Sequence, residues 1–455
     1  MALLFLCFFG FMIIRMPVAY CMLCSSIIYS MVYGESLNMI VSRAVQGSSG
    51  FTLLALSFFI LAGNIMNRGG VTDRIFNFCK KTIGWIPGGL GHANVLASVV
   101  FAGMSGSAVA DAGGLGAIEI KAMKDNGYDE EFAVAITGAS SCIGPIIPPT
   151  ISGVVYCVAS GVSVGKMFIA GILPGCCLAV VQMIYVYIAA KKREYPRTPF
   201  GGFRDLSRSF VTSFPALLTP IIILGGIITG ICTPTEASVV AVLYALLQGF
   251  LTRDLKWKDL PGIMDDTLTS AMSVLFIVSC ANAFGYIITA QQIPGKLAAV
   301  FLSVVTNKFI ALLVINIFLL LVGMVMESLA ALVILVPILM PVIASFGIDP
   351  LHFGIVCILN ITIGMLTPPV GMVLFALSNV SSLSFERITK AMLPLLAVNF
   401  IALLIVSLLY TSDAADDLLC VDLGGRRIIK KKKNRRARVL GSPTNMKLST
   451  RLERH

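Results

Sequence analysis

The chain has 455 residues, of which 57% are apolar and only 13% are charged, and its formal net charge is +11. No water-soluble fold buries that much hydrocarbon, which excludes an ordinary soluble domain. The basic excess does not indicate nucleic-acid binding, because residues 413–455 alone hold 12 Lys and Arg against 5 Asp and Glu. The composition therefore predicts a polytopic membrane protein.

Long uncharged runs mark the candidate membrane spans in chain order. Residues 1–33 have no basic segment at their start and no small-residue cleavage site, so we expect a retained span and not a signal peptide. The later runs are each near or above the ~18 to 20 residues that a helix needs to cross a bilayer. They cover residues 267–295, 309–326, 328–348, 350–385 and 391–412.

Two basic clusters set the expected orientation in the membrane. One covers Lys191 to Arg208 and the other Arg253 to Lys258, with apolar spans at about 211–231 and 236–251 between them. Two crossings return the chain to one side, so the positive-inside rule predicts that both clusters are cytoplasmic. The Thr233-Pro234-Thr235-Glu236 turn is then expected on the other side, where it has the pattern of a helix-initiating capping box.

The sequence repeats itself at an offset of 220 residues. The matches are Gly103-Met104 with Gly323-Met324, Gly127 with Gly347, Ile143-Gly144 with Ile363-Gly364, Pro148-Pro149 with Pro368-Pro369, and Leu173-Pro174 with Leu393-Pro394. Because Gly and Pro stay in register without a gap, we interpret the match as an internal duplication. Duplicated halves are typical of secondary transporters, whose sites form where the repeats meet.

Each half contains a polar segment inside apolar sequence. The first is Gly103 to Asp111 and the second is Gly323 to Ser328. Such a segment predicts the turn of a re-entrant helical hairpin, which is tolerated at membrane depth only where it is buried in protein or lines a wet cavity.

Each half then contains a helix break, at Ile143 to Thr150 and at Ile363 to Gly371. Adjacent prolines lack amide hydrogens and force the preceding residue out of helical conformation, so a continuous helix is excluded. The freed carbonyls suit Na⁺, and the N-terminus of the next half-helix suits an anion. The alternative is a proline kink that only shapes packing.

These devices divide the chain into two repeats and a tail. The first repeat, residues 1–204, is expected to hold scaffold spans, a hairpin near 95–125 and a broken helix near 131–160. The second, residues 205–412, repeats this order with a hairpin near 312–345 and a broken helix near 351–380. We expect an all-α polytopic membrane protein with two inverted repeats. Residues 413–455 are expected to be a disordered basic tail or sequence that is not native.

Buried polar groups are candidates for function. Asp111 and Glu327 lie beside the predicted hairpin turns inside apolar sequence, where an ionised carboxylate is costly. Each carboxylate either serves a site or forms a structural salt bridge or a cap on the hairpin's amides. Asn360, just before the second break, is either an ion or hairpin contact or one more interhelical hydrogen-bonding residue.

An enzyme is the remote alternative. Gly103-Met104-Ser105-Gly106 matches the GxSG pattern of intramembrane serine proteases, for which only His92 or His352 could be the partner. The second half has no serine at the matching position, so we expect no catalytic residues. The sequence also has no HExxH, Walker A or dinucleotide-binding motif.

With these motifs described, the chain resembles the large membrane subunit, DctM type, of tripartite ATP-independent periplasmic (TRAP) transporters over about residues 8–410. The resemblance is carried by LLALSFFILAGNIMNRGG at 53–70, GGLGHANVLASVVFAGMSGSAVAD at 88–111, GYDEEFAVAITGASSCIGPIIPPT at 127–150, GICTPTEA at 230–237 and NITIGMLTPPVG at 360–371. Thr150 replaces a common serine and keeps its hydroxyl.

The resemblance implies an elevator-type, Na⁺-coupled importer of an organic acid such as a dicarboxylate, keto acid or sialic acid, in the bacterial inner membrane. It implies a small four-helix membrane subunit and a periplasmic substrate-binding protein as partners, and no cofactor besides Na⁺. A stand-alone Na⁺/anion symporter is the nearest alternative.

The resemblance also implies three groups of site residues. A first sodium site would use Ser105, Gly106, Ser107, Gly144, Pro145 and Pro148. A second would use Met326, Glu327, Ser328, Gly364, Thr367, Pro368 and Gly371. Substrate would lie near Asp111, Pro149, Thr150, Asn360 and Pro369.

Overall fold

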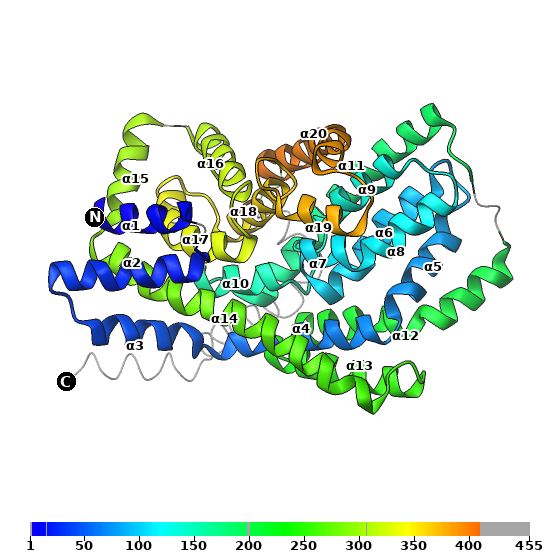
Figure 1. The fold of residues 1–455 in the computed structure, drawn as a ribbon, viewed down its shortest axis with the longest axis horizontal. Coiled ribbons are helices and arrows are strands. Elements are labelled where there is room, and N and C mark those ends of the chain that lie inside the picture. The colour runs from blue at the N-terminus through cyan, green and yellow to red at the C-terminus, as the bar shows by residue number, and fades with distance from the viewer. Residues whose placement is uncertain (1, 15, 198–200, 306, 410–455) are drawn as a thin grey trace, which may run out of the picture. The chain divides into compact units, whose positions relative to one another are not determined.

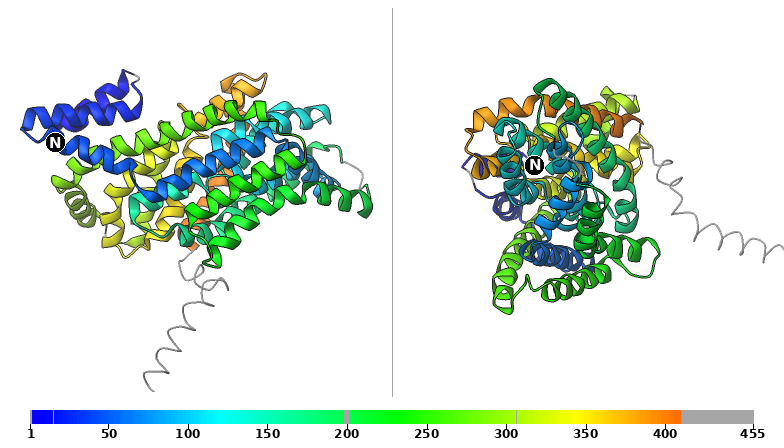
Figure 2. Two further views of the ribbon diagram at one scale, coloured as in Figure 1. Left: turned by 90° about the horizontal axis from the view of Figure 1, so that it is seen from below. Right: turned by 90° about the vertical axis from the view of Figure 1, so that its right-hand side faces the viewer.

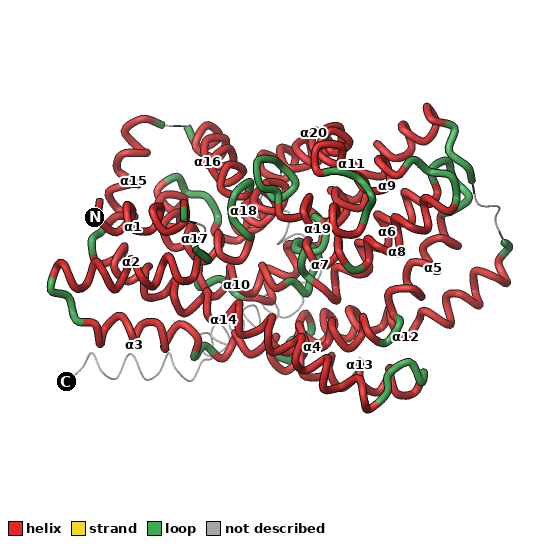
Figure 3. Tube along the Cα trace, in the orientation of Figure 1, coloured by secondary structure: helices red, strands yellow, loops and turns green. Residues whose placement is uncertain are grey.

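The computed structural model describes residues 2–409 except 15, 198–200 and 306. Across these residues the regular elements are helices, and none is a strand (Figures 1 and 3). The predicted basic tail, residues 413–455, lies outside the described part of the chain. The predicted all-helical class is confirmed.

The helices of the first half are α1 (Ala2–Ile13), α2 (Val18–Tyr33), α3 (Leu37–Ser48), α4 (Phe51–Arg68), α5 (Val71–Ile83), α6 (Gly89–Ser105), α7 (Ala108–Gly113), α8 (Leu115–Asp125), α9 (Glu130–Ser141), α10 (Ile151–Ser160) and α11 (Val164–Arg193). Those of the second half are α12 (Phe203–Ile228), α13 (Pro234–Leu251), the 3₁₀ helix η1 (Trp257–Asp259), α14 (Leu260–Ala290), α15 (Ile293–Val304), α16 (Lys308–Gly323), α17 (Ser328–Ser345), α18 (Pro350–Gly364), α19 (Met372–Val380) and α20 (Phe385–Leu409).

Seven of the described helices are long and apolar enough to cross a membrane. They are α4, α11, α12, α13, α14, α17 and α20. The helices α16 and α18 are also apolar but shorter, and both belong to segments that fold back or break. This confirms a multi-pass membrane protein.

Helix boundaries in the two halves recur at a spacing of about 220 residues. The pairs are α6 and α16 (starting at 89 and 308), α9 and α18 (130 and 350), α10 and α19 (151 and 372), and α11 and α20 (164 and 385). The chain leaves helical conformation between α9 and α10 and between α18 and α19, and the Pro148-Pro149 and Pro368-Pro369 peptide bonds are cis.

Two groups of helices frame the site. In one group α3 and α4 pack along α14, with α2 also on α14 and α13 on α4 (Figures 1 and 2). In the other group the helices next to the polar turns pack on the broken helices: α6 and α8 on α9, and α16 and α17 on α18. The helices α10 and α17 touch each other, and α10 also touches α4 while α17 touches α14.

Local sequence explains the helix starts that orient these groups. Thr233 and Glu236 form the predicted capping box at the start of α13, since each side chain accepts a hydrogen bond from the other residue's backbone amide. Arg68, the last residue of α4, forms an ion pair at 3.1 Å with Asp266, which lies near the start of α14. The start of α14 therefore lies next to the end of α4.

Candidate functional site

The first polar turn is built on a glycine. Helix α6 ends at Ser105, Gly106 has a φ of +60°, and Ser107 caps α7 by accepting a hydrogen bond from the Ala110 amide at 3.4 Å. A Cβ atom on Gly106 would lie 3.0 Å from the Ile151 nitrogen. Glycine is therefore required both for the left-handed turn and for its contact with the start of α10. The Ser105 side chain lies outside the described structure.

This turn meets the first helix break. A Cβ atom on Gly103 would lie 3.6 Å from both the Pro148 carbonyl oxygen and the Pro149 Cδ. Thr150 caps α10, because its hydroxyl accepts a hydrogen bond from the Gly153 amide at 2.7 Å. Residues 142–150 are buried throughout, so the first break is sealed within protein.

A buried carboxylate lies against the first break. Asp111 is 2% exposed, and its Oδ2 occupies the space that a side chain on Gly144 would need. Glu119 in α8 is 1% exposed, and its Oε1 has no hydrogen-bond partner among the described residues. Sequence reasoning missed Glu119. The feature that could have indicated Glu119 is its position as an acidic residue in the arm of the predicted hairpin.

The second polar turn is closed by a carboxylate. Glu327 caps α17, since its Oε2 accepts hydrogen bonds from the Leu329 and Ala330 amides at 3.2 and 3.3 Å. The Ser328 hydroxyl donates to Glu327 Oε1 at 3.4 Å. The sequence allowed Glu327 either a role in a site or a structural role such as a cap, and the structure contains the cap. The same carboxylate also lines a cavity.

The second turn also meets its own break. The Gly371 amide donates a hydrogen bond to the Met324 carbonyl at 3.2 Å, and a Cβ atom on Gly323 would lie 2.5 Å from the Ile361 oxygen and 3.1 Å from the Gly364 Cα. Thr367 donates from its hydroxyl to the Ile363 oxygen at 3.1 Å. Unlike the first break, this one is partly open, because Pro369 is exposed.

Both turns line one cavity of about 220 Å³, here called the inter-hairpin cavity. Gly106 and Ser107 come from the first turn, Glu327 and Ser328 from the second, and Ser152 from the start of α10. The facing wall consists of α4 and α14. Its polar residues are Asn64, Asn67 and Ser270.

Sequence reasoning missed the polar residues of the facing wall because they belong to helices without a break. Asn64 donates to the Thr267 hydroxyl at 2.9 Å, which joins α4 to α14. Asn67 accepts from the Thr72 hydroxyl at 3.0 Å. Glu327 is the only charged residue that lines the cavity in the described part of the chain.

Several predicted site residues lie away from this cavity. Asn360 is fully buried and donates hydrogen bonds to Asn316 Oδ1 and to the Val356 carbonyl, both at 2.8 Å, while Asn316 donates to Ser407. Asn360 thus joins α18 to α16, which in turn is bonded to α20. Pro145 and Thr150 face a separate space of about 10 Å³.

The structure gives the protease alternative no support. His92 precedes Ser105 by 13 residues in the same helix, which places them about 20 Å apart along its axis. His352 hydrogen-bonds to the Val406 carbonyl at 3.1 Å. His92 therefore does not have the position of a base acting on Ser105, and His352 is hydrogen-bonded to α20.

Solved structures with a similar fold are membrane transporters. The YdaH transporter of Alcanivorax borkumensis matches with a TM-score of 0.62 and 14% identity, covering 82% of this chain and 88% of that one. MtrF of Neisseria gonorrhoeae, described among antimetabolite efflux pumps, matches with a TM-score of 0.55 and 14% identity, covering 83% and 84%. At this identity the likeness concerns the fold alone.

Sequence comparison identifies the family. The model of the DctM component of tripartite ATP-independent periplasmic transporters matches residues 5–411. The sialic acid TRAP transporter large permease SiaM of Vibrio cholerae is 43% identical over 88% of this chain and 94% of its own length. The C4-dicarboxylate large permease DctM of the same species is 36% identical over 89% and 95%.

The chain therefore belongs to the DctM family of TRAP transporter large permeases. Members of this family are transport proteins of the bacterial inner membrane and not enzymes, which agrees with the helices long enough to span a membrane.

Proposed function

We propose that this chain is the large permease subunit of a Na⁺-coupled importer for an organic acid anion of the sialic acid, dicarboxylate or keto acid type. A periplasmic substrate-binding protein would deliver the substrate, and a small four-helix membrane subunit would complete the complex. The observation that carries this proposal is the inter-hairpin cavity, where the turns of the two halves meet against Asn64 and Ser270.

The charge of the cavity supports cation coupling. No Lys or Arg is among the described residues that line it, whereas Glu327 adds a carboxylate. An organic anion that enters such a site needs positive charge close by, because desolvated like charges repel strongly. Sodium ions held at the two breaks supply that charge. Their ligands would come from the first and second groups of residues named from the sequence.

The contacts between turns and breaks support the same assignment. Gly103 lies near the Pro148 carbonyl, and Gly371 is bonded to Met324. Each polar turn thus packs against its own break, and each contact includes a backbone carbonyl oxygen, that of Pro148 in the first and that of Met324 in the second. Such oxygens are the kind of ligand that Na⁺ takes in broken-helix transporters.

We further propose that the halves are inverted repeats covering residues 1–204 and 205–412, and that transport uses an elevator motion. The turns with their broken helices would move as one body along α4 and α14. The recurrence of helix starts at about 220 residues supports the duplication.

Reconstitution tests the function. The chain, purified with its small subunit, is placed in liposomes with its binding protein, and uptake of radiolabelled sialic acid or succinate is measured with and without a sodium gradient. We expect uptake that needs sodium and the binding protein. Uptake by the chain alone, indifferent to the binding protein, would instead establish the stand-alone symporter.

A further inference from the structure

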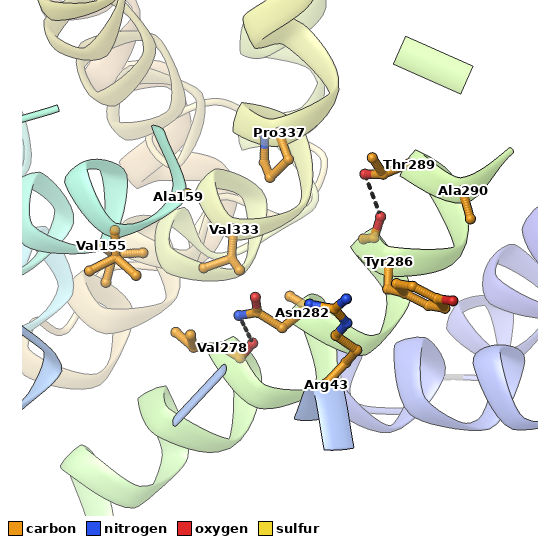
Figure 4. Close-up of a pocket in the computed structure, with 13 residues that line it drawn as sticks. Arg43, Val155, Ala159, Val278, Asn282, Tyr286, Thr289, Ala290, Val333 and Pro337 are labelled. Carbon is orange, nitrogen blue, oxygen red and sulfur yellow. Dashed lines mark hydrogen bonds between the residues drawn. The ribbon is translucent and has the colours of Figure 1, made fainter. Parts of the chain in front are cut away.

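A second and larger cavity contains an arginine that has no acidic partner among the described residues. This cavity, here called the Arg43 chamber, measures about 510 Å³ and is lined by α3, α10, α14 and α17. Its polar side chains are Arg43, Asn282, Tyr286 and Thr289 (Figure 4). No Asp or Glu occurs among the described residues that line it.

The Arg43 side chain is exposed and held in place by its neighbours. Its guanidinium lies over the Tyr286 ring, 5.1 Å from the ring centroid, and Nη1 donates to Gln46 Oε1 at 3.5 Å. Stacking on an aromatic ring leaves the edge of the guanidinium free, and this edge matches the geometry of a carboxylate. None of the ion pairs of the described chain includes Arg43.

Asn282 is fixed next to this arginine. It donates to the Val278 carbonyl at 2.9 Å, and a Cβ atom on Gly47 would lie only 2.7 Å from its side-chain nitrogen. The close approach of α3 to α14 therefore sets both polar walls of the chamber. Across from them lie Val155 and Ala159 of α10 and Val333 and Pro337 of α17 (Figure 4).

Three helices line both the chamber and the inter-hairpin cavity. On each of them the residues that line the cavity precede those that line the chamber. On α14 the cavity is lined by Ser270 and the chamber by Tyr286, which are about 24 Å apart along the helix. On α10 the corresponding residues are Ser152 and Val155, and on α17 they are Ser328 and Val333. The two spaces thus follow one another along α10, α14 and α17.

With the basic clusters on the cytoplasmic side, as the positive-inside rule predicts, the chamber lies on the side of the molecule from which an importer takes its substrate. Helix α14 begins directly after the basic cluster at residues 253–258, which is predicted to be cytoplasmic, and Asp266, paired with Arg68, lies near that start. Tyr286 lies about 30 Å from Asp266 along the helix, toward its other end. An incoming anion would therefore reach Arg43 before the cavity between the hairpins.

We propose that the Arg43 chamber is an entry subsite that binds the carboxylate of the incoming organic acid before it enters the inter-hairpin cavity. This inference rests on the proposed function. The chamber supplies a fixed positive charge that the inter-hairpin cavity lacks, and its volume falls in the range of ordinary ligand sites. Positive charge at an entrance raises the local concentration of an anion.

A chemical footprint tests the site without requiring transport. The purified complex in detergent, without sodium, is treated with phenylglyoxal, which modifies accessible guanidinium groups, and the modification of each arginine is followed by mass spectrometry. Millimolar sialic acid or succinate should slow modification of Arg43 several-fold and leave Arg68 unchanged. Equal modification with and without both acids would overturn the proposal. Protection by phosphatidylglycerol alone would also overturn it, because the chamber would then be a lipid headgroup site.

Transport kinetics give the second test. In liposomes of phosphatidylcholine only, Arg43→Gln should raise KM for the transported acid roughly tenfold, as expected for the loss of one charge-assisted contact. Vmax and the sodium dependence should stay unchanged, and Arg43→Lys should keep most of the affinity. Arg68→Gln is the matched control and should leave KM unchanged.

The transport result can also contradict the proposal. An unchanged KM, or a lower Vmax at constant KM, would refute the entry subsite, as would loss of the small subunit from the Arg43→Gln complex. Failure of the proposed function is a separate result, since the unmutated complex would then not transport either acid while the footprint still decides whether Arg43 binds them.

Discussion

Gly323 allows the second hairpin to pack closely against the helix before its break. Replacing Gly323 by alanine therefore gives a quantitative prediction. The added Cβ atom would lie 2.5 Å from the Ile361 oxygen, about 0.9 Å short of the 3.4 Å at which ordinary contact begins. Both Ile361 and Gly364 are backbone neighbours, so no flexible side chain can give way. The end of α16 must therefore move away from α18.

Two effects on stability oppose each other in this variant. Overpacking costs about 1 to 3 kcal/mol, while Gly→Ala at the last residue of α16 contributes at most about 1 kcal/mol of helix propensity. We expect a net loss of at most about 3 kcal/mol, so that the protein still folds. The larger effect concerns sodium, because a shift of this size displaces the Met324 carbonyl that accepts the Gly371 amide.

The assay is sodium activation of uptake in liposomes, with thermal unfolding in detergent as the measure of folding. Gly323→Ala should raise the sodium concentration for half-maximal uptake about tenfold or more, since misplacement of binding groups by about 1 Å is costly. Gly225→Ala in α12 is the control, because its Cβ would meet nothing within 4 Å. Wild-type sodium activation in Gly323→Ala would refute the proposed link between this contact and the ion site.

Three further predictions concern the breaks, the cap and the buried amides. Replacing Pro148-Pro149 or Pro368-Pro369 by Ala-Ala should weaken sodium dependence more than it lowers the folded amount in membranes, and unchanged sodium activation in both variants would remove the ion-site assignment. Glu327→Gln keeps an acceptor for the Leu329 and Ala330 amides and should leave thermal stability nearly unchanged while raising the sodium requirement, whereas Glu327→Ala should also cost about 1 kcal/mol of stability. Asn316→Ala should destabilise the protein by about 1 to 3 kcal/mol, seen as a lower unfolding temperature, because it leaves Asn360 buried without its partner.

The features that the sequence predicted are those with a local chemical cause. Paired prolines exclude a helix whatever surrounds them, so the interruptions after α9 and α18 follow from Pro148-Pro149 and Pro368-Pro369 directly. The Thr233–Glu236 capping box is likewise a relation between residues three apart.

The features that the sequence did not predict depend on long-range packing. Asn64 and Ser270 become site residues only because α4 and α14 pack side by side, and neither lies in the polar turns or helix breaks from which the sequence predicted a site. Asn360, expected near substrate from its position before a break, donates a hydrogen bond to Asn316, 44 residues away, a pair that no sequence pattern indicated. Nothing in the sequence around Arg43 indicated a binding site, since its proposed role depends on a cavity formed by four separate helices.

The two breaks have nearly the same sequence pattern but different surroundings. Residues 142–150 are buried throughout, whereas Pro369 is exposed and Thr367 and Pro368 are half-buried. If the halves are inverted repeats, as we propose, a conformation open to one side must place the two breaks in different environments, because exchanging those environments converts one access state into the other. Under this proposal the asymmetry belongs to the conformation and not to the sequence. An ion at the second break would then have the shorter path to water, and one at the first break would be enclosed.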